Sequence, residues 1–323
     1  METKKNKIAF HDNTINLRGS SVAMFDYAHF NETLLGNKSI IVLRKDKVKE
    51  SDIKALLKFV KRFKIFIYEN ILDLERILEE EKCSFLYCIK YGTNDGIYSK
   101  KVKTIIHCVF DMSDPHGDIY SGVSRVLANK FYKTDYLPHM ISLKPDNRFH
   151  LKQSLGIKDN DLVFGRYGGM DTFNIEFCWN VIEKIVNERT DIYFVFVNTP
   201  QIKIHKNIIY LNCITEENEK NAFINTCDAF LECGTMGHTF GLSIGEFSVN
   251  NKPIIAYLGD NLWNCAHIDI LREKGIYFRN EVEFYNILNN FNKNWCIGNY
   301  NAYEKFTPEL IMEEFHRKFL EEN

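Results

Sequence analysis

The sequence predicts an α/β protein with parallel sheets, and three observations carry this prediction. Short apolar runs typical of buried strands alternate along the chain with stretches of helical period. The chain has 323 residues, enough for two domains at about 100–200 residues each. Pro138 and Pro145 bracket a connection that separates one strand and helix series from a second.

The first series lies before this connection. Its expected strands are residues 8–10, 40–43, 65–68, 85–89 and 104–110, and its expected helices are 21–35, 51–62 and 71–81. A polar loop over 111–118 follows, and then a helix to about Phe131 and a short strand near Tyr136. The order of these elements is typical of a doubly wound unit.

The second series begins at Asp161. Its expected strands are residues 162–165, 192–197, 208–211, 229–232 and 254–257, and its expected helices are 174–188, 216–226, one from about 240, two more after 257, and 308–320. The final helix is not followed by a strand. No internal sequence repeat relates the two series.

Composition excludes several classes of protein. Lys and Arg number 41 against 43 Asp and Glu, so the net charge of −2 gives no field that would hold a nucleic acid. The nine cysteines are scattered and never spaced C-x-x-C, which indicates reduced, mostly buried thiols. No signal-peptide core or run of about 20 apolar residues is found, so we expect a cytoplasmic protein.

Metal-binding patterns are also absent. Asp159 and Asp161 form a D-x-D pattern, but it precedes its strand and is interpreted as a turn. His107, His116 and His139 lack metal-ligand spacing. We therefore expect neither a metal nor a cofactor.

One glycine-rich turn follows the strand at 162–165. Gly165, Gly168 and Gly169 would let the backbone approach a ligand, and Arg166 offers a guanidinium suited to diphosphate. The pattern is not G-x-G-x-x-G, which disfavours a dinucleotide site. A tight turn carrying a surface arginine is an equally good interpretation of the segment.

A second loop feeds a helix after residue 237. Free amides at the helix start would lie beside His238 and Thr239, and Glu246 would follow about two turns later. A carboxylate there can accept both hydroxyls of a ribose while the helix N-terminus holds the phosphates. The alternative is an ordinary helix carboxylate.

This second loop resembles the donor signature of family 4 glycosyltransferases, which are retaining enzymes of the GT-B fold. Residues 240–242 (Phe-Gly-Leu), Glu246 and residues 253–256 (Pro-Ile-Ile-Ala) match the family pattern in order and spacing. Residues 136–141 and 155–166 resemble the interdomain linker and the first strand of the donor domain. The resemblance is strong over residues 160–260 and weak before 130.

The resemblance implies two Rossmann-like domains that face each other across a cleft. It divides the chain into an acceptor-side domain at 1–142, a donor domain at 143–300 and a C-terminal helix at 301–323 that returns to the first domain. The donor-binding residues it implies are Gly19, Ser20, Gly168, Gly169, His238, Thr239, Phe240, Gly241, Leu242 and Glu246. Arg166 falls on the family's diphosphate-binding arginine.

Three positions depart from the family pattern. His238 replaces the first glutamate, the lysine after the diphosphate arginine is missing, and Lys90 lies near the position of a catalytic histidine. Lys90 would neutralise the leaving phosphate, or it would be an ordinary solvated loop lysine. His116 is a further candidate for the catalytic site.

The activity implied is transfer of a sugar from a UDP- or GDP-sugar to a hydroxyl of a glycan or glycoconjugate, with retained configuration and without a metal. Arg166, Lys90 and helix N-terminal amides would stabilise the diphosphate. Two alternatives stay open: a nucleotide-sugar 2-epimerase of the same fold, and a non-catalytic protein that binds sugar nucleotides.

A basic stretch runs from Arg44 to Lys64, with nine Lys and Arg against three acidic residues. Its apolar residues Ile53, Leu56, Leu57 and Val60 fall on one helical face. A solvated surface helix is the favoured interpretation, and a peripheral membrane contact or an acceptor-docking surface is the alternative.

Overall fold

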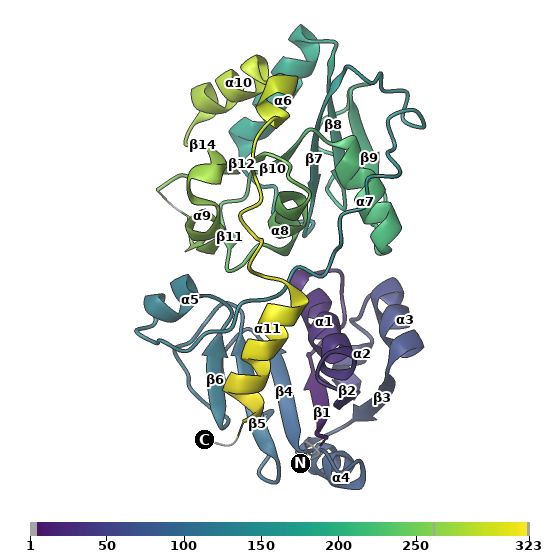
Figure 1. The fold of residues 1–323 in the computed structure, drawn as a ribbon, viewed down its shortest axis with the longest axis vertical. Coiled ribbons are helices and arrows are strands. Elements are labelled where there is room, and N and C mark those ends of the chain that lie inside the picture. The colour runs from purple at the N-terminus through teal and green to yellow at the C-terminus, as the bar shows by residue number, and fades with distance from the viewer. Residues whose placement is uncertain (1–4, 261, 322–323) are drawn as a thin grey trace. The chain divides into compact units, whose positions relative to one another are not determined.

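The computed structural model describes residues 5–260 and 262–321, and the chain folds into two compact units. The first unit holds the chain up to Ser142 together with the segment from Phe306 on, and the second holds Leu143–Lys305. Each unit is a parallel sheet covered by helices (Figure 1). This is the α/β architecture that the alternating pattern predicts.

The sheet of the first unit has the strand order β3-β2-β1-β4-β5-β6, and every pairing in it is parallel. Its strands are β1 (Lys7–His11), β2 (Lys38–Arg44), β3 (Lys64–Tyr68), β4 (Phe85–Lys90), β5 (Lys103–Cys108) and β6 (Ile119–Gly122). The central strand β1 is paired on both sides, Ala9 with Ile40 and with Leu86, and these three side chains are buried.

Four helices of the first unit begin at a side-chain cap: α3 (Ile53–Arg62), α4 (Ile71–Glu80), α5 (Arg125–Lys130) and α11 (Pro308–Phe315), which continues as a π-helix, η3 (His316–Leu320). The unit also holds α1 (Gly19–Thr33) and α2 (Lys45–Val48). The side chains of Asp52, Asn70 and Ser124 each accept a backbone N–H of the first helical turn. Residues 119–122, expected to be helical, instead form the edge strand β6, and the helix starts only after Ser124.

The second unit repeats this plan with the strand order β14-β12-β10-β7-β8-β9, again all parallel. Its main strands are β7 (Leu162–Tyr167), β8 (Ile192–Val197), β9 (Ile208–Leu211), β10 (Ala229–Glu232), β12 (Ile254–Tyr257) and β14 (Gly275–Phe278). A separate pair joins β11 (Gly237–His238) to β13 (Asn264–Cys265). The strands β11, β13 and β14 had no counterpart in the sequence-based prediction.

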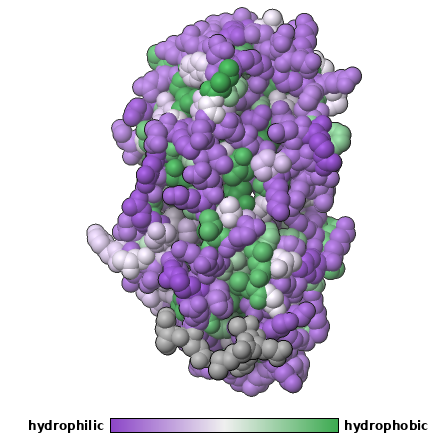
Figure 2. Space-filling model, viewed as in Figure 1, coloured by the Kyte–Doolittle hydropathy of each residue, from purple (hydrophilic) through white to green (hydrophobic). Residues whose placement is uncertain are grey.

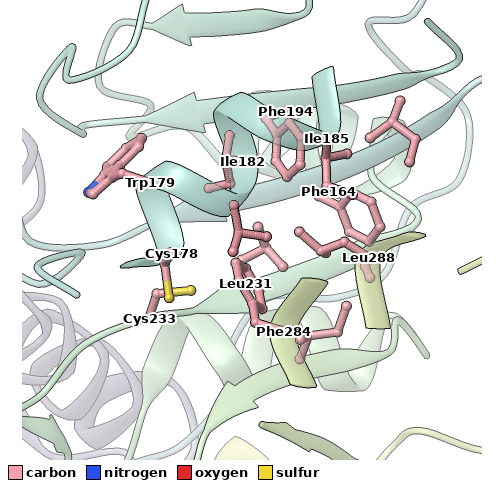
Figure 3. Close-up of a cluster of buried hydrophobic side chains, with 14 of the residues drawn as sticks. Phe164, Cys178, Trp179, Ile182, Ile185, Phe194, Leu231, Cys233, Phe284 and Leu288 are labelled. Carbon is pink, nitrogen blue, oxygen red and sulfur yellow. The ribbon is translucent and has the colours of Figure 1, made fainter. Parts of the chain in front are cut away.

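The helices of the second unit cover both faces of its sheet. They are α6 (Glu176–Glu188), α7 (Glu217–Thr226), α8 (Leu242–Val249), α9 (Ala266–Leu271) and α10 (Glu281–Asn290), with short 3₁₀ turns η1 (Arg272–Lys274) and η2 (Lys293–Cys296). Figure 3 shows the core beneath α6, where Ile182 and Ile185 lie over Phe164 and Phe194. This buried layer packs α6 against the strands of the sheet.

The expectation of reduced, mostly buried cysteines is met by the described residues. All nine cysteines are free thiols and six of them are buried. Within residues 5–260 and 262–321, no helix has the length and apolar character needed to cross a bilayer.

Candidate functional site

The glycine-rich turn after β7 is held from beneath by Arg166. The guanidinium donates to the carbonyl of Gly169 at 2.8 Å and to the hydroxyls of Thr172 and Thr199. Asn198, at the end of β8, donates to the carbonyl of Gly168 at 2.7 Å. Arg166, Asn198 and Thr199, from two neighbouring strand ends, therefore fix the path of residues 168–172.

Arg166 is buried, whereas the sequence-based alternative made it a surface arginine. The residue is only 1% exposed, and its guanidinium carbon lies 5.5 Å from the centroid of the Phe173 ring. Burial lowers the pKa of Arg166 from its usual value, and Glu232 opposes this shift. That alternative is wrong because the loop over 168–172 folds across the guanidinium.

The loop after β10 is bonded directly to this turn. The backbone N–H of Asn174 donates to the carbonyl of Cys233 at 3.2 Å, and its side chain accepts from the N–H of Thr235 at 3.0 Å. A Cβ on Gly234 would lie 2.5 Å from the carbonyl oxygen of Thr172, so only glycine allows this approach. The two loops that the sequence singles out are thus neighbours at the carboxyl edge of the sheet.

A buried carboxylate lies under the second loop. The Nε2 atom of His238 is 2.8 Å from Oε2 of Glu232, whose Oε1 accepts from the N–H of Gly234 at 3.1 Å. Burial alone would raise the pKa of Glu232, but His238 and Arg166 hold it below its usual value. Burial lowers the pKa of His267 to about 3, so that ring is neutral.

The helix α8 begins at a residue that only glycine fills without strain. Gly241 is its N-cap, with φ of 88° in the left-handed region and no side-chain cap. The preceding carbonyl of Phe240 accepts from the buried hydroxyl of Tyr303 at 2.7 Å. The amides of the first turn, beginning at Leu242, therefore have no capping side chain, as an anion-binding helix start requires.

Glu246 lies in the second turn of α8 and is paired. Its Oε1 accepts from Nζ of Lys220, on α7, at 2.7 Å, and both side chains are mostly buried. The same ammonium lies 5.7 Å from the centroid of the Tyr167 ring at the end of β7. The hydroxyl of Tyr167 is buried and makes no hydrogen bond within the described part of the chain.

A second polar cluster closes the carboxyl end of β4 in the first unit. The ammonium of Lys90, with its side chain 3% exposed, donates to Asp95, to the carbonyl of Ile97 at 3.2 Å and to Nε2 of His116 at 3.3 Å. The Nδ1–H of His116 donates to the carbonyl of Asp114 at 2.7 Å. Lys90 and His116, which were predicted separately, therefore lie together.

The start of α1 lies beside the end of β1. Gly19 and Ser20 are its first two residues, and Arg18 before them provides no side-chain cap. Asp12 is nearly buried and accepts from the hydroxyl of Ser21 at 3.1 Å. Burial raises the pKa of Asp12 to about 6, which is a suitable value for a proton acceptor near neutral pH.

The first unit also has a surface hollow of about 780 Å³ at the carboxyl ends of β2 and β3. Its lining residues are Lys45, Ile67, Glu69, Asn70, Leu72, Asp73 and Arg76. None of these was predicted as a site residue. No group of three metal-ligating side chains occurs among the residues that the structure describes.

Sequence reasoning missed several polar residues of these clusters: Asp12, Tyr167, Thr172, Thr199, Lys220, Glu232 and His267. Most of them lie in loops or at strand ends, where only the alignment of the strands brings other polar groups near them. Glu232 carried a usable signal, because a carboxylate that ends a buried strand needs a partner.

Comparisons with known proteins rest on structure alone. No protein-family model matches the sequence, and no curated protein matches it. HepE of Anabaena in complex with UDP and glucose has a TM-score of 0.72 at 13% identity, covering 97% of this chain and 98% of that one. WaaG, a glycosyltransferase involved in lipopolysaccharide biosynthesis, has a TM-score of 0.64 at 10% identity, with 97% and 100% covered.

A third similar structure is a Listeria monocytogenes protein provisionally assigned as a UDP-N-acetylglucosamine 2-epimerase. Its TM-score is 0.61 at 11% identity, with 99% of this chain and 98% of that one covered. Together with the two six-stranded parallel sheets, these similarities define the fold class of the chain as GT-B. The expected fold class is confirmed.

Proposed function

We propose that the chain is a glycosyltransferase that takes a sugar from a nucleotide-diphosphate sugar and transfers it to an acceptor hydroxyl. The observation that carries this proposal lies in the second unit. There the loop over 168–172, the loop over 233–241 and the uncapped start of α8 converge at one edge of the sheet. An anionic ligand is favoured at such an edge.

We assign the nucleotide to the α8 side of this edge. The amides that begin at Leu242 would bind the diphosphate, and Glu246 would accept the ribose hydroxyls while Lys220 holds its carboxylate. Gly168 and Gly169 would give the ligand access to backbone. UDP is the first nucleotide to test, because HepE was crystallised with UDP and glucose.

We assign the sugar to the segment from His238 to Gly241. Glu232 holds the imidazole of His238, so Thr239 and the backbone at Phe240 are the remaining polar contacts. Arg166 lies too deep to reach solvent and would act by fixing the turn and by its positive charge. It is therefore a positioning residue in this proposal.

The chemical step would break the bond between the anomeric carbon and the β-phosphate oxygen and form a bond to the acceptor oxygen. We propose that configuration is retained by a front-face step, in which the leaving phosphate takes the acceptor proton and no protein nucleophile is needed. Lys90 would neutralise the leaving phosphate, His116 is a further candidate for the catalytic site, and Gly19 and Ser20 are assigned to the donor. We propose a reaction without a metal, because the charge on the diphosphate is met by amides and cations.

A ligand titration tests the proposal first. We expect UDP or GDP to raise the melting temperature of the full chain in a concentration-dependent way, with Kd measured by calorimetry. We then expect UDP release from a UDP-sugar only when an acceptor glycan is added, and no loss of rate in EDTA. Proton NMR of the product would report retention. Failure of every nucleotide diphosphate to bind would contradict the proposal.

One observation favours a second candidate, a nucleotide-sugar 2-epimerase. His238 occupies the position of the family's first glutamate, and Glu232 fixes its ring beside the sugar segment. Incubation with UDP-N-acetylglucosamine and no acceptor separates the two. Appearance of the 2-epimer would establish the epimerase, and an unchanged sugar with acceptor-dependent transfer would exclude it.

A further inference from the structure

The helix α3 in the first unit turns apolar side chains to solvent. Ile53 is 74% exposed, Leu57 50% and Val60 55%, and their spacing of four and three residues places them on one face. In Figure 2, apolar atoms (green) interrupt the hydrophilic surface, including the edge where α3 lies in Figure 1. A surface helix normally turns such a face inward.

The orientation of α3 is fixed by its opposite face. Ala55 and Phe59 are buried, and the Phe59 ring packs edge-on against Phe25 of α1 at 5.2 Å. Arg62 is paired with Glu32 of α1 at 2.7 Å. Because these contacts anchor the inner face, the exposed apolar row is a stable feature of the surface.

Unpaired positive charge flanks this row. Lys54, Lys58 and Lys61 recur at the same spacing along α3, and the helix contains no acidic residue. Within the described residues, Lys54 and Lys61 form no ion pair, and Lys58 lies over the Phe25 ring. We call Ile53, Leu57, Val60, Lys54, Lys58 and Lys61 the α3 surface.

The acidic residues near the α3 surface are already engaged. Asp46 pairs with Arg44 at 2.8 Å, Glu50 pairs with Lys47 at 2.9 Å, and Asp52 accepts from the first turn of α3. None of them neutralises the lysines of the helix. The net character of this surface is therefore cationic as well as apolar.

We propose that the α3 surface binds the interface of an anionic lipid bilayer. A row of aliphatic side chains beside a row of lysines suits a layer in which anionic headgroups cover hydrocarbon, and the lysine stems extend along that layer. A second copy of this chain fits less well, because a two-fold contact through this face would bring lysines against lysines. The α3 surface belongs to the first unit, whereas the amides of α8 and Glu246, proposed to bind the nucleotide, belong to the second.

Vesicle sedimentation of the full chain tests this inference without any sugar or nucleotide. We expect binding to vesicles of phosphatidylcholine with 30% phosphatidylglycerol and not to phosphatidylcholine alone, with weaker binding in 500 mM NaCl than in 50 mM. Changing Lys54, Lys58 and Lys61 to Gln should lower the partition coefficient about 100-fold, at about fivefold per lysine. Changing Ile53, Leu57 and Val60 to Ser should also abolish binding.

The matched control is Ile204→Ser with Lys206→Gln, at an exposed isoleucine and lysine in the second unit where Ile204 is 93% exposed. This variant should bind vesicles as the unchanged chain does. A Leu57→Trp variant should show a blue-shifted emission with anionic vesicles if the row enters the interface. Absence of vesicle binding, equal binding by the lysine variant, or a dimer lost in the Ser variant would overturn the proposal. UDP binding is measured separately, so a failure of the membrane proposal would leave the proposed nucleotide site unaffected.

Discussion

The ammonium of Lys220 lies 2.7 Å from Oε1 of Glu246, so α7 and α8 are joined by a mostly buried ion pair at the carboxyl edge of the second sheet. The sequence singled out Glu246 as a carboxylate for ribose but gave no reason to look at Lys220. The lysine fixes the orientation of this carboxylate. A carboxylate that is already oriented loses little entropy on binding.

Glu246→Gln should weaken UDP binding. A charge-assisted hydrogen bond contributes about 1.5–3 kcal/mol, which corresponds to about a 10-fold to 150-fold rise in Kd by calorimetry. Glu219→Gln, at an exposed glutamate of α7, is the matched control and should bind as the unchanged chain does. An unaltered Kd for the Glu246 variant would remove this residue from the nucleotide site.

Arg166→Ala should destabilise the second unit. The change removes a guanidinium that is 1% exposed and leaves Thr199 and Gly169 without their donor, at a cost of about 3 kcal/mol. Urea unfolding measures this loss, and Arg148→Ala, at an exposed arginine, should leave the midpoint unchanged. An intact midpoint for the Arg166 variant would show that the turn over 168–172 holds without it.

Glu232→Gln should alter stability in a pH-dependent way. Because the folded pKa of Glu232 lies below the usual value of 4.5, its contribution is complete above that pH and is lost as the pH falls through the folded pKa. The stability difference between the unchanged chain and the variant should therefore shrink between pH 4.5 and pH 3. Urea titrations at pH 5.5, 4.5 and 3.5 measure it. A difference that grows toward pH 3 would contradict the lowered pKa.

Asp12→Asn should show the opposite trend. Burial raises the folded pKa of Asp12 from 3.8 to about 6. The free energy of unfolding of the unchanged chain therefore falls as the pH rises through this range, because ionised Asp12 is less favourable in the folded state. The variant should gain stability relative to the unchanged chain by up to about 3 kcal/mol between pH 4 and pH 7, since one pKa unit is about 1.4 kcal/mol. A constant difference over that range would place the pKa of Asp12 near its usual value.

The spacing of apolar residues, together with turn-forming residues, predicted most of the strands and helices. Both are local signals that can be seen in a short stretch of sequence. The strand at Ile119–Gly122 was missed because its four residues include Ser121 and Gly122, and only pairing with β5 makes them a strand. The strand at Gly275–Phe278 is similarly short and depends on β12. Short edge strands acquire their structure from neighbours that are distant in sequence.

Site residues that belong to a sequence motif could be predicted. Site residues that matter only through a contact with a distant part of the chain could not. Gly241 and Glu246 belong to a recognisable pattern, and the structure puts Gly241 in the left-handed conformation that explains the glycine. Lys220 and Glu232 become informative only through their partners. The burial of Arg166 could not be seen either, because it depends on how the following turn folds back.

The position of α11 in the first unit determines the order in which the two units can fold. Phe315 stacks on Tyr27 at 5.3 Å, and the N–H of Ile141 donates to the carbonyl of Phe306 at 2.7 Å, so the C-terminal segment completes the core of the first unit. During synthesis, the first unit can be completed only after the segment from Phe306 on has been made, whereas Leu143–Lys305 can fold before that segment is made. A nascent chain halted at Lys305 would expose the Tyr27 face of α1 to chaperones.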